Sequence, residues 1–124
     1  MTLALTTKRG DTFVRQFRVV RGSDPVLVSP EEILFTIKAL ASDPDPGLAQ
    51  VSLTGGGVVI DDPGPPDPLL GVDALITVRI SDAVMEGIAV GDYFHDLQVK
   101  ENGGRKTTPR CGRFIVTQDF TATV

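Results

Sequence analysis

Short apolar runs that alternate with clusters of Gly and Pro recur along the whole chain, and they restrict it to a fold built from short strands. The clearest run is EEILFTIKAL at residues 31–40. A period of two places successive side chains on opposite faces of a β-strand. Turn-forming residues are abundant, with 13 Gly and 9 Pro among 124 residues. The pattern therefore predicts an all-β domain rather than a bundle of long helices.

The predicted strands follow one another with turn signals between them, and one short helix interrupts the series. The strand runs are residues 3–7, 12–20, 31–40, 48–53, 58–61, 73–81, 93–100 and the segment from 105 to the end. Residues 54–57, TGGG, predict a hairpin turn between two of these strands. In residues 81–88, SDAVMEGI, Ser81 suits a helix N-cap and Gly87 a helix end, which predicts one or two helical turns.

The alternating runs also identify a core. In residues 12–20, Phe13 and Phe17 share a face that Arg15 interrupts. The side chains predicted to be buried are Phe35, Ile37, Ile76, Val78, Leu97, Val99, Phe114 and Val116. Together with the strand count, these apolar faces predict one β-sandwich domain over residues 1–124.

Composition argues against several classes of partner. The net charge is −4 and Lys and Arg form no dense cluster, so a nucleic-acid partner is not expected. No apolar run approaches the length of a membrane helix, and the first residues lack the pattern of a secretory signal peptide. The single cysteine, Cys111, cannot form a disulfide within the chain. We therefore expect synthesis in a cytoplasm and no membrane partner.

The segment GDYFHDLQVKENGGRKT, residues 91–107, contains the only Tyr and the only His of the chain. A Tyr at the start of a late strand, after a tight corner, is typical of immunoglobulin-like sandwiches, where its hydroxyl bonds to the backbone. Tyr93 has this position and His95 follows it, so both are predicted to form a structural corner. The predicted fold is an immunoglobulin-like antiparallel β-sandwich of seven to eight short strands with one short helical crossover.

Candidates for chemistry are few. A catalytic His needs an orienting acid and a nucleophile, and a zinc ion needs three or four ligands, whereas the chain offers His95 and Cys111 alone. Arginines near Cys111 favour a reactive thiolate, but a small strand residue is the stronger interpretation. The acidic loops, residues 43–47 and 61–68, lack the spacing of a calcium loop. No catalytic residue, metal or cofactor is predicted.

Two segments carry a resemblance to a known family. The first is KRGDTFVRQFRV, residues 8–19, and the second is GDYFHDLQVKENGGRKTTPRCGRFIVTQDFT, residues 91–121. Together with SPEEILFTIKA, residues 29–39, they resemble the immunoglobulin-like N-terminal domains of bacteriophage baseplate upper proteins and tail-fibre attachment proteins. The resemblance implies a non-enzymatic virion protein of the tail or baseplate, docked to other phage structural proteins. It implies no catalytic residues.

The two ends of the chain add a physical reason to expect assembly. Both read as short alternating strands with few charges, and such edge strands pair with partners. The candidate partner contacts are Leu3, Leu5, Phe120, Ala122 and Val124. The alternative is that both ends complete this chain's own sandwich. As an assembly protein it is expected to be a homo-oligomer in the particle.

A second function stays open at this point. Immunoglobulin-like domains also serve as carbohydrate- or surface-binding modules, but these generally present exposed Trp or Tyr, and the chain has no Trp and one Tyr. An enzyme is the third possibility, and the shortage of His, Cys and recognisable nucleophile motifs counts against it.

Overall fold

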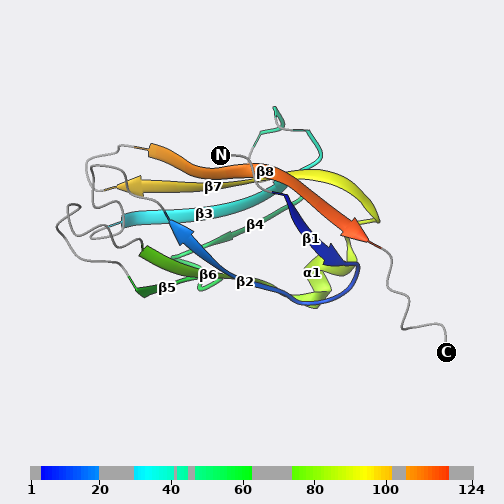
Figure 1. Cartoon of the computed structure of the whole chain (residues 1–124), viewed down its shortest axis with the longest axis horizontal. Coiled ribbons are helices and arrows are strands. Elements are labelled where there is room, and N and C mark those ends of the chain that lie inside the picture. The colour runs from blue at the N-terminus through cyan, green and yellow to red at the C-terminus, as the bar shows by residue number, and fades with distance from the viewer. Residues whose placement is uncertain are drawn as a thin grey trace.

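The computed structural model describes residues 4–19, 30–40, 42–44, 47–62, 74–101 and 106–117. Their elements are, in chain order, β1 (Leu5–Lys8), β2 (Phe13–Val19), β3 (Pro30–Lys38), β4 (Ala49–Ser52), β5 (Val58–Asp62), β6 (Ala74–Ile80), α1 (Asp82–Glu86), β7 (Gly91–Glu101) and β8 (Lys106–Thr117). One sheet has the strand order β1-β8-β7-β3-β4 and the other β2-β6-β5. The two sheets lie face to face as a sandwich (Figure 1). The predicted all-β, immunoglobulin-like fold is confirmed.

The core fills the space between the two sheets, and all eight residues predicted for it are buried. Its centre is aromatic. The Phe35 ring of the five-stranded sheet stacks with Phe13 and Phe17 of the other sheet, each at a centroid distance of 5.9 Å. Phe114 packs against Phe13 at 5.2 Å. Such offset or tilted ring pairs add to the burial energy, and they fix the spacing of the two layers.

Strand pairing departs from the prediction in one respect. Every described pair is antiparallel except β1 with β8, which run parallel with Leu5 beside Phe114 and Lys8 beside Thr117. The sandwich is therefore not purely antiparallel. The sequence period cannot reveal this, because alternation fixes which face a side chain points to and leaves the direction of the neighbouring strand open.

The prediction of a hairpin at residues 54–57 is wrong. β4 lies at an edge of the five-stranded sheet and β5 at an edge of the three-stranded sheet, so these residues cross from one layer to the other. A Cβ atom on Gly57 would lie only 2.5 Å from Val51 Cβ. Glycine is required here because β4 and the start of β5 approach each other closely as the chain changes sheets.

A carboxylate near the start of β3, that of Glu32, holds this crossing. Glu32 accepts hydrogen bonds from the Thr54 backbone N–H at 3.0 Å, from the Thr54 hydroxyl at 2.6 Å and from the Ile33 backbone N–H at 3.1 Å. Burial raises the pKa of Glu32, but these hydrogen bonds outweigh burial and hold the pKa below its ordinary value. The charged form therefore fastens the crossing to β3.

The outer face of β3 is more buried than its polar sequence indicates. Thr36 and Lys38 point away from the core, as predicted, yet their exposed fractions are only 1% and 8%. Gly47 lies over them, because a Cβ added there would be 2.9 Å from Lys38 Cγ and 3.3 Å from Thr36 Cγ2. Lys38 is paired with Asp96 at 3.3 Å. Ala39, predicted to share the inner face, is exposed because β3 ends at Lys38.

The helical turns predicted at residues 81–88 are confirmed as α1. The Ser81 side chain caps the helix by accepting from the Val84 N–H at 3.3 Å, and Gly87 ends it. Its Met85 and the following Ile88 enter the core. None of the helices in the described part of the chain is long and apolar enough to cross a membrane.

Candidate functional site

Tyr93 forms the predicted corner. Its hydroxyl donates to the carbonyl oxygen of Ala89 at 2.7 Å, and its half-buried ring packs against the core. The bond ties the start of β7 to the segment that leaves α1. The predicted hydrogen bond from the Tyr93 hydroxyl to the backbone is confirmed.

His95 is a core residue. It is 2% exposed, stacks on Phe35 at a centroid distance of 5.6 Å and meets the edge of Phe114 at 6.4 Å. Its Nδ1 lies 3.1 Å from the carbonyl oxygen of Arg113. Because a carbonyl oxygen only accepts, this contact places a proton on Nδ1. The ring thus serves as a packed, polar bridge between β7 and β8.

Cys111 lies exposed on β8, directly across from Asp96 of β7. Beside it is a shallow hollow of about 270 Å³ on the outer face of the five-stranded sheet, to which Phe94 and the Lys38–Asp96 pair also contribute. The Asp96 carboxylate across from the thiol is paired with Lys38, so the interpretation of Cys111 as a small strand residue stays the better one.

The acidic segments have structural roles where they are described, Asp43 in a bend and Asp61 within β5. Asp43 accepts from the Leu40 N–H at 3.0 Å and so closes the bend after β3. Asp61 accepts from the Thr77 hydroxyl and from Gln16 Nε2, which together hold its pKa below the ordinary value. Within the described ranges, no three or more His, Cys, Asp or Glu side chains gather as metal ligands would.

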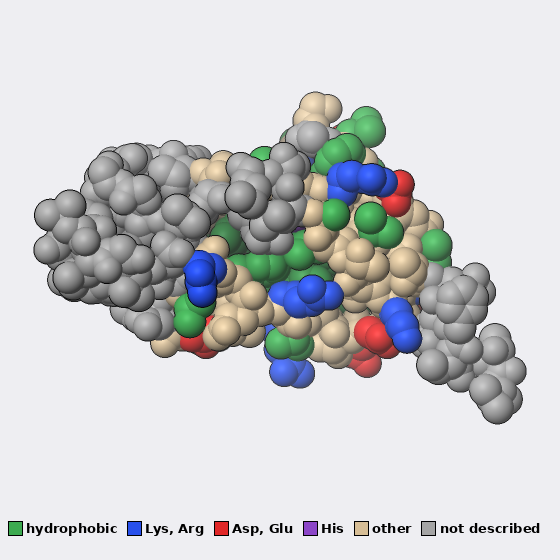
Figure 2. All heavy atoms as spheres, viewed as in Figure 1, with side chains coloured by type: hydrophobic (Ala, Val, Ile, Leu, Met, Phe, Trp, Pro, Cys, Tyr) green, Lys and Arg blue, Asp and Glu red, His purple; other side chains and the backbone are tan. Residues whose placement is uncertain are grey.

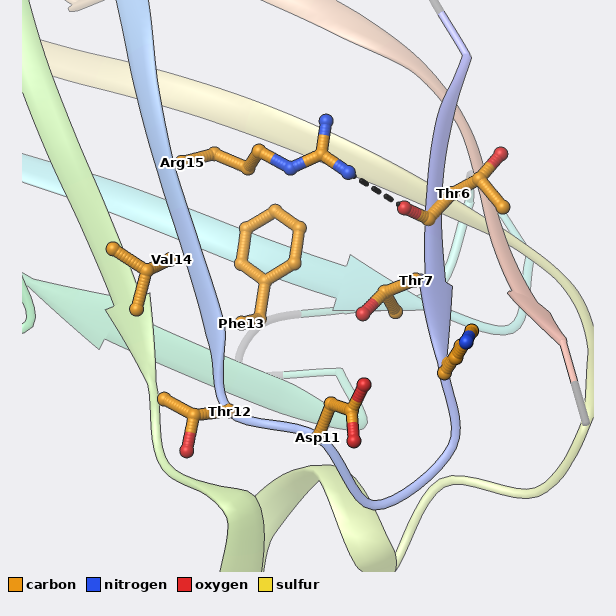
Figure 3. Close-up of a pocket in the computed structure, with 8 residues that line it drawn as sticks. Thr6, Thr7, Asp11, Thr12, Phe13, Val14 and Arg15 are labelled. Atoms are coloured by element: carbon orange, nitrogen blue, oxygen red, sulfur yellow. Dashed lines mark hydrogen bonds between the residues drawn. The ribbon is translucent and has the colours of Figure 1, made fainter. Parts of the chain in front are cut away.

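The candidate site is an open groove between β1 and β2, which are the edge strands of the two sheets on the same side of the sandwich. The groove has a volume of about 310 Å³ and is lined by residues of β1, by Asp11 and Thr12, and by the first residues of β2. Arg15 spans it, with Nη2 2.8 Å from the carbonyl oxygen of Thr6 (Figure 3). Two strand edges therefore face each other across a gap that one side chain bridges.

The groove is lined mainly by polar side chains, with the Phe13 ring at its base. Figure 3 shows the Phe13 ring between the two strands and next to the Arg15 side chain, whose guanidinium carbon lies 5.8 Å from the ring centroid. Phe13 is only 1% exposed, so it closes the base of the groove as part of the core. In Figure 2, which has the same view as Figure 1, apolar side chains show at the bottom of a hollow near the middle of this face, with Lys or Arg side chains beside it. The groove thus combines polar strand edges with a buried aromatic ring at its base.

The predicted partner contacts divide into two groups. Leu5 is 5% exposed and belongs to the core, so its prediction as a partner contact is wrong: β1 pairs with β8 and turns this side chain inward. Leu3, Phe120, Ala122 and Val124 lie outside the described residues.

Sequence reasoning missed Arg15 and the backbone of Thr6. One signal was visible. Arg15 has the same phase as Phe13 and Phe17, and a charged side chain on an inward face is typical of an edge strand.

Comparisons with known proteins add little. No protein-family model matches the chain, and no curated protein matches it either. Among solved structures, it is similar to AggA, the major subunit of aggregative adherence fimbriae type I from Escherichia coli. The identity is 14% and the TM-score 0.38, over 94% of this chain and 91% of that one. At this distance the match does not bear on function.

Proposed function

We propose that this protein is a non-enzymatic structural subunit of a bacteriophage particle, of the tail or baseplate, which docks to other subunits through the edges of its β-sandwich. The observation that carries the proposal is the groove between β1 and β2, where an edge of each sheet faces solvent on the same side. Exposed strand edges are templates for pairing with another chain.

The side chains that could have taken part in catalysis or ligand binding make structural contacts instead, which supports a structural role. His95 is used for packing in the core, Tyr93 for holding a corner, and the carboxylates of Glu32 and Asp61 for hydrogen bonds that fasten loops and strands. The resemblance of residues 8–19 and 91–121 to phage attachment domains supplies the kind of particle.

Mass spectrometry of particles tests this function. Phage particles are purified from a lysate of the host that carries the gene, and the chain is quantified against a known virion protein. We expect a fixed, multiple copy number per particle. A chain that is abundant in the lysate and missing from the particles would refute the proposal, and selective binding on a glycan array would then favour the surface-binding module.

A further inference from the structure

We propose that the groove between β1 and β2 is an acceptor site for an added strand, and that residues 118–124 of a second copy of this chain occupy it. This inference rests on the proposed structural role and names the partner of that surface. It concerns where the copies join, and it is tested on the purified protein.

β1 directs some of its backbone hydrogen-bonding groups toward the groove. On the β8 side, Thr7 accepts from the Thr117 hydroxyl at 3.2 Å, and the Arg9 N–H donates to the Thr117 carbonyl at 2.8 Å. Backbone groups of successive residues in a strand point to alternate sides. The N–H groups of Thr6 and Lys8 therefore face the groove, as does the Thr6 carbonyl that Arg15 contacts.

Among the described residues, the opposite side of the sandwich is closed where β4 and β5 meet. There, β4 and β5 are the edge strands, and the crossing at residues 53–57 brings them together so tightly that Gly57 has no room for a Cβ atom. The β1/β2 side is spanned by the Arg15 side chain instead. An incoming strand can take the place of the guanidinium at the Thr6 carbonyl.

Residues 118–124, QDFTATV, have the properties of such a strand. Phe120, Ala122 and Val124 alternate with polar residues, and Asp119 is the one charged residue of the segment. The alternation gives the segment one apolar face and one polar face, as in a strand that joins a sandwich. Asp119 also complements Lys8 and Arg15 at the groove.

Geometry favours the segment of a second copy over the chain's own. Thr117, from which the segment departs, lies beside Lys8 on the side of β1 that is remote from the groove. At that same end of β1, residues 9–12 connect to β2 and close the groove. The chain's own segment would have to round this connection, and at about 3.3 Å per residue few of its residues would remain to pair. A second copy can enter from the open end, near Leu5.

The first experiment asks whether the segment joins copies. The full chain and two variants, Ala122→Pro and Ala122→Ser, are compared by light scattering up to about 1 mM, a concentration that populates even weak complexes. Proline removes a ladder N–H, whereas serine keeps it. We expect the native chain to self-associate, Ala122→Ser to associate somewhat more weakly because its hydroxyl faces the groove, and Ala122→Pro to associate roughly tenfold more weakly than Ala122→Ser or not at all.

The second experiment locates the contact by disulfide trapping, in chains that all carry Cys111→Ala. Copies with Thr6→Cys are mixed with copies with Thr121→Cys, and the matched control replaces Thr6→Cys with Thr108→Cys, an exposed threonine of β8 in the same sheet. Side chains on neighbouring strands come within disulfide range. We expect mixed dimers with Thr6→Cys and few with Thr108→Cys.

Each other outcome overturns the inference. A native chain that stays monomeric, or self-association that Ala122→Pro does not weaken, removes the segment as the connector. Equal trapping at Thr108→Cys removes the groove as its site. If Thr6→Cys and Thr121→Cys in one chain form an internal disulfide in preference to dimers, the chain's own segment occupies the groove. None of these results decides the mass spectrometry of purified particles, so the proposed function is tested separately from this inference.

Discussion

At the scale of single residues, Tyr93 shows how one polar atom positions a strand. Its hydroxyl reaches back to Ala89 at 2.7 Å while its ring lies against the core. Tyr93→Phe keeps the ring and removes the bond, so we expect unfolding to become easier by about 1 kcal/mol, the net value of one hydrogen bond. Denaturant titration measures this difference, and an unchanged midpoint would show that the bond contributes nothing to the corner.

At Gly57, stability depends on the absence of a side chain. Gly57→Ala would press a methyl group against Val51, and overpacking of this kind costs about 1 to 3 kcal/mol. The matched control is Gly87→Ala, where the nearest atom would be 3.4 Å away and φ is −74°. We expect thermal unfolding to shift downward for Gly57→Ala and hardly at all for Gly87→Ala. Equal shifts of the unfolding temperature would mean that the crossing rearranges at little cost to accommodate the methyl group.

At the scale of elements, the fastening of the 53–57 crossing to β3 depends on the charge of Glu32. Its pKa is lower in the folded than in the unfolded protein, so the stabilisation is complete above the ordinary value of 4.5 and is lost as the pH falls through the folded pKa. Glu32→Gln should melt at a lower temperature than the native chain at about pH 7, and the gap should close in acid. Glu86→Gln, at an exposed carboxylate of α1, is the control. A gap that persists in acid would assign the effect to shape rather than charge.

The elements themselves were largely predictable, and their arrangement was not. Alternation identified the strand faces and the core residues, because the solvent side and the core side of a strand impose that period directly. The capping residues Ser81 and Gly87 identified α1. Alternation could not separate a hairpin from a crossing at residues 54–57, since both need glycine at a turn. Nor could it assign Leu5, which reads equally well as an exposed edge or as a core side chain. The groove could not be predicted either, because it depends on which strands lie next to each other.

At the scale of the whole molecule, the positions of the strands predict how backbone protection is distributed. β3 and β7 each have a neighbour on both sides, whereas β1 pairs with β8 on one side among the described strands. In dilute solution we expect slow hydrogen exchange in β3 and β7, and an alternating pattern in β1, with Thr7 slower than Thr6 and Lys8. Exchange measured by NMR would resolve these amides. Uniform protection along β1 at low concentration would contradict an open edge.

The parallel pairing of β1 with β8 has a consequence for biosynthesis. β1 leaves the ribosome before β8, the strand beside it in the sheet, which begins only at Lys106. The β2-β6-β5 layer can pair once Ile80 has been translated, but Leu5 finds its place beside Phe114 only after all of the strands from β2 to β7 have been translated. Long-range pairing of this kind is slow and leaves apolar surface uncovered in the meantime. While β2 to β7 are being translated, β1 therefore lacks its partner strand, and this is the period in which a chaperone could bind the nascent chain.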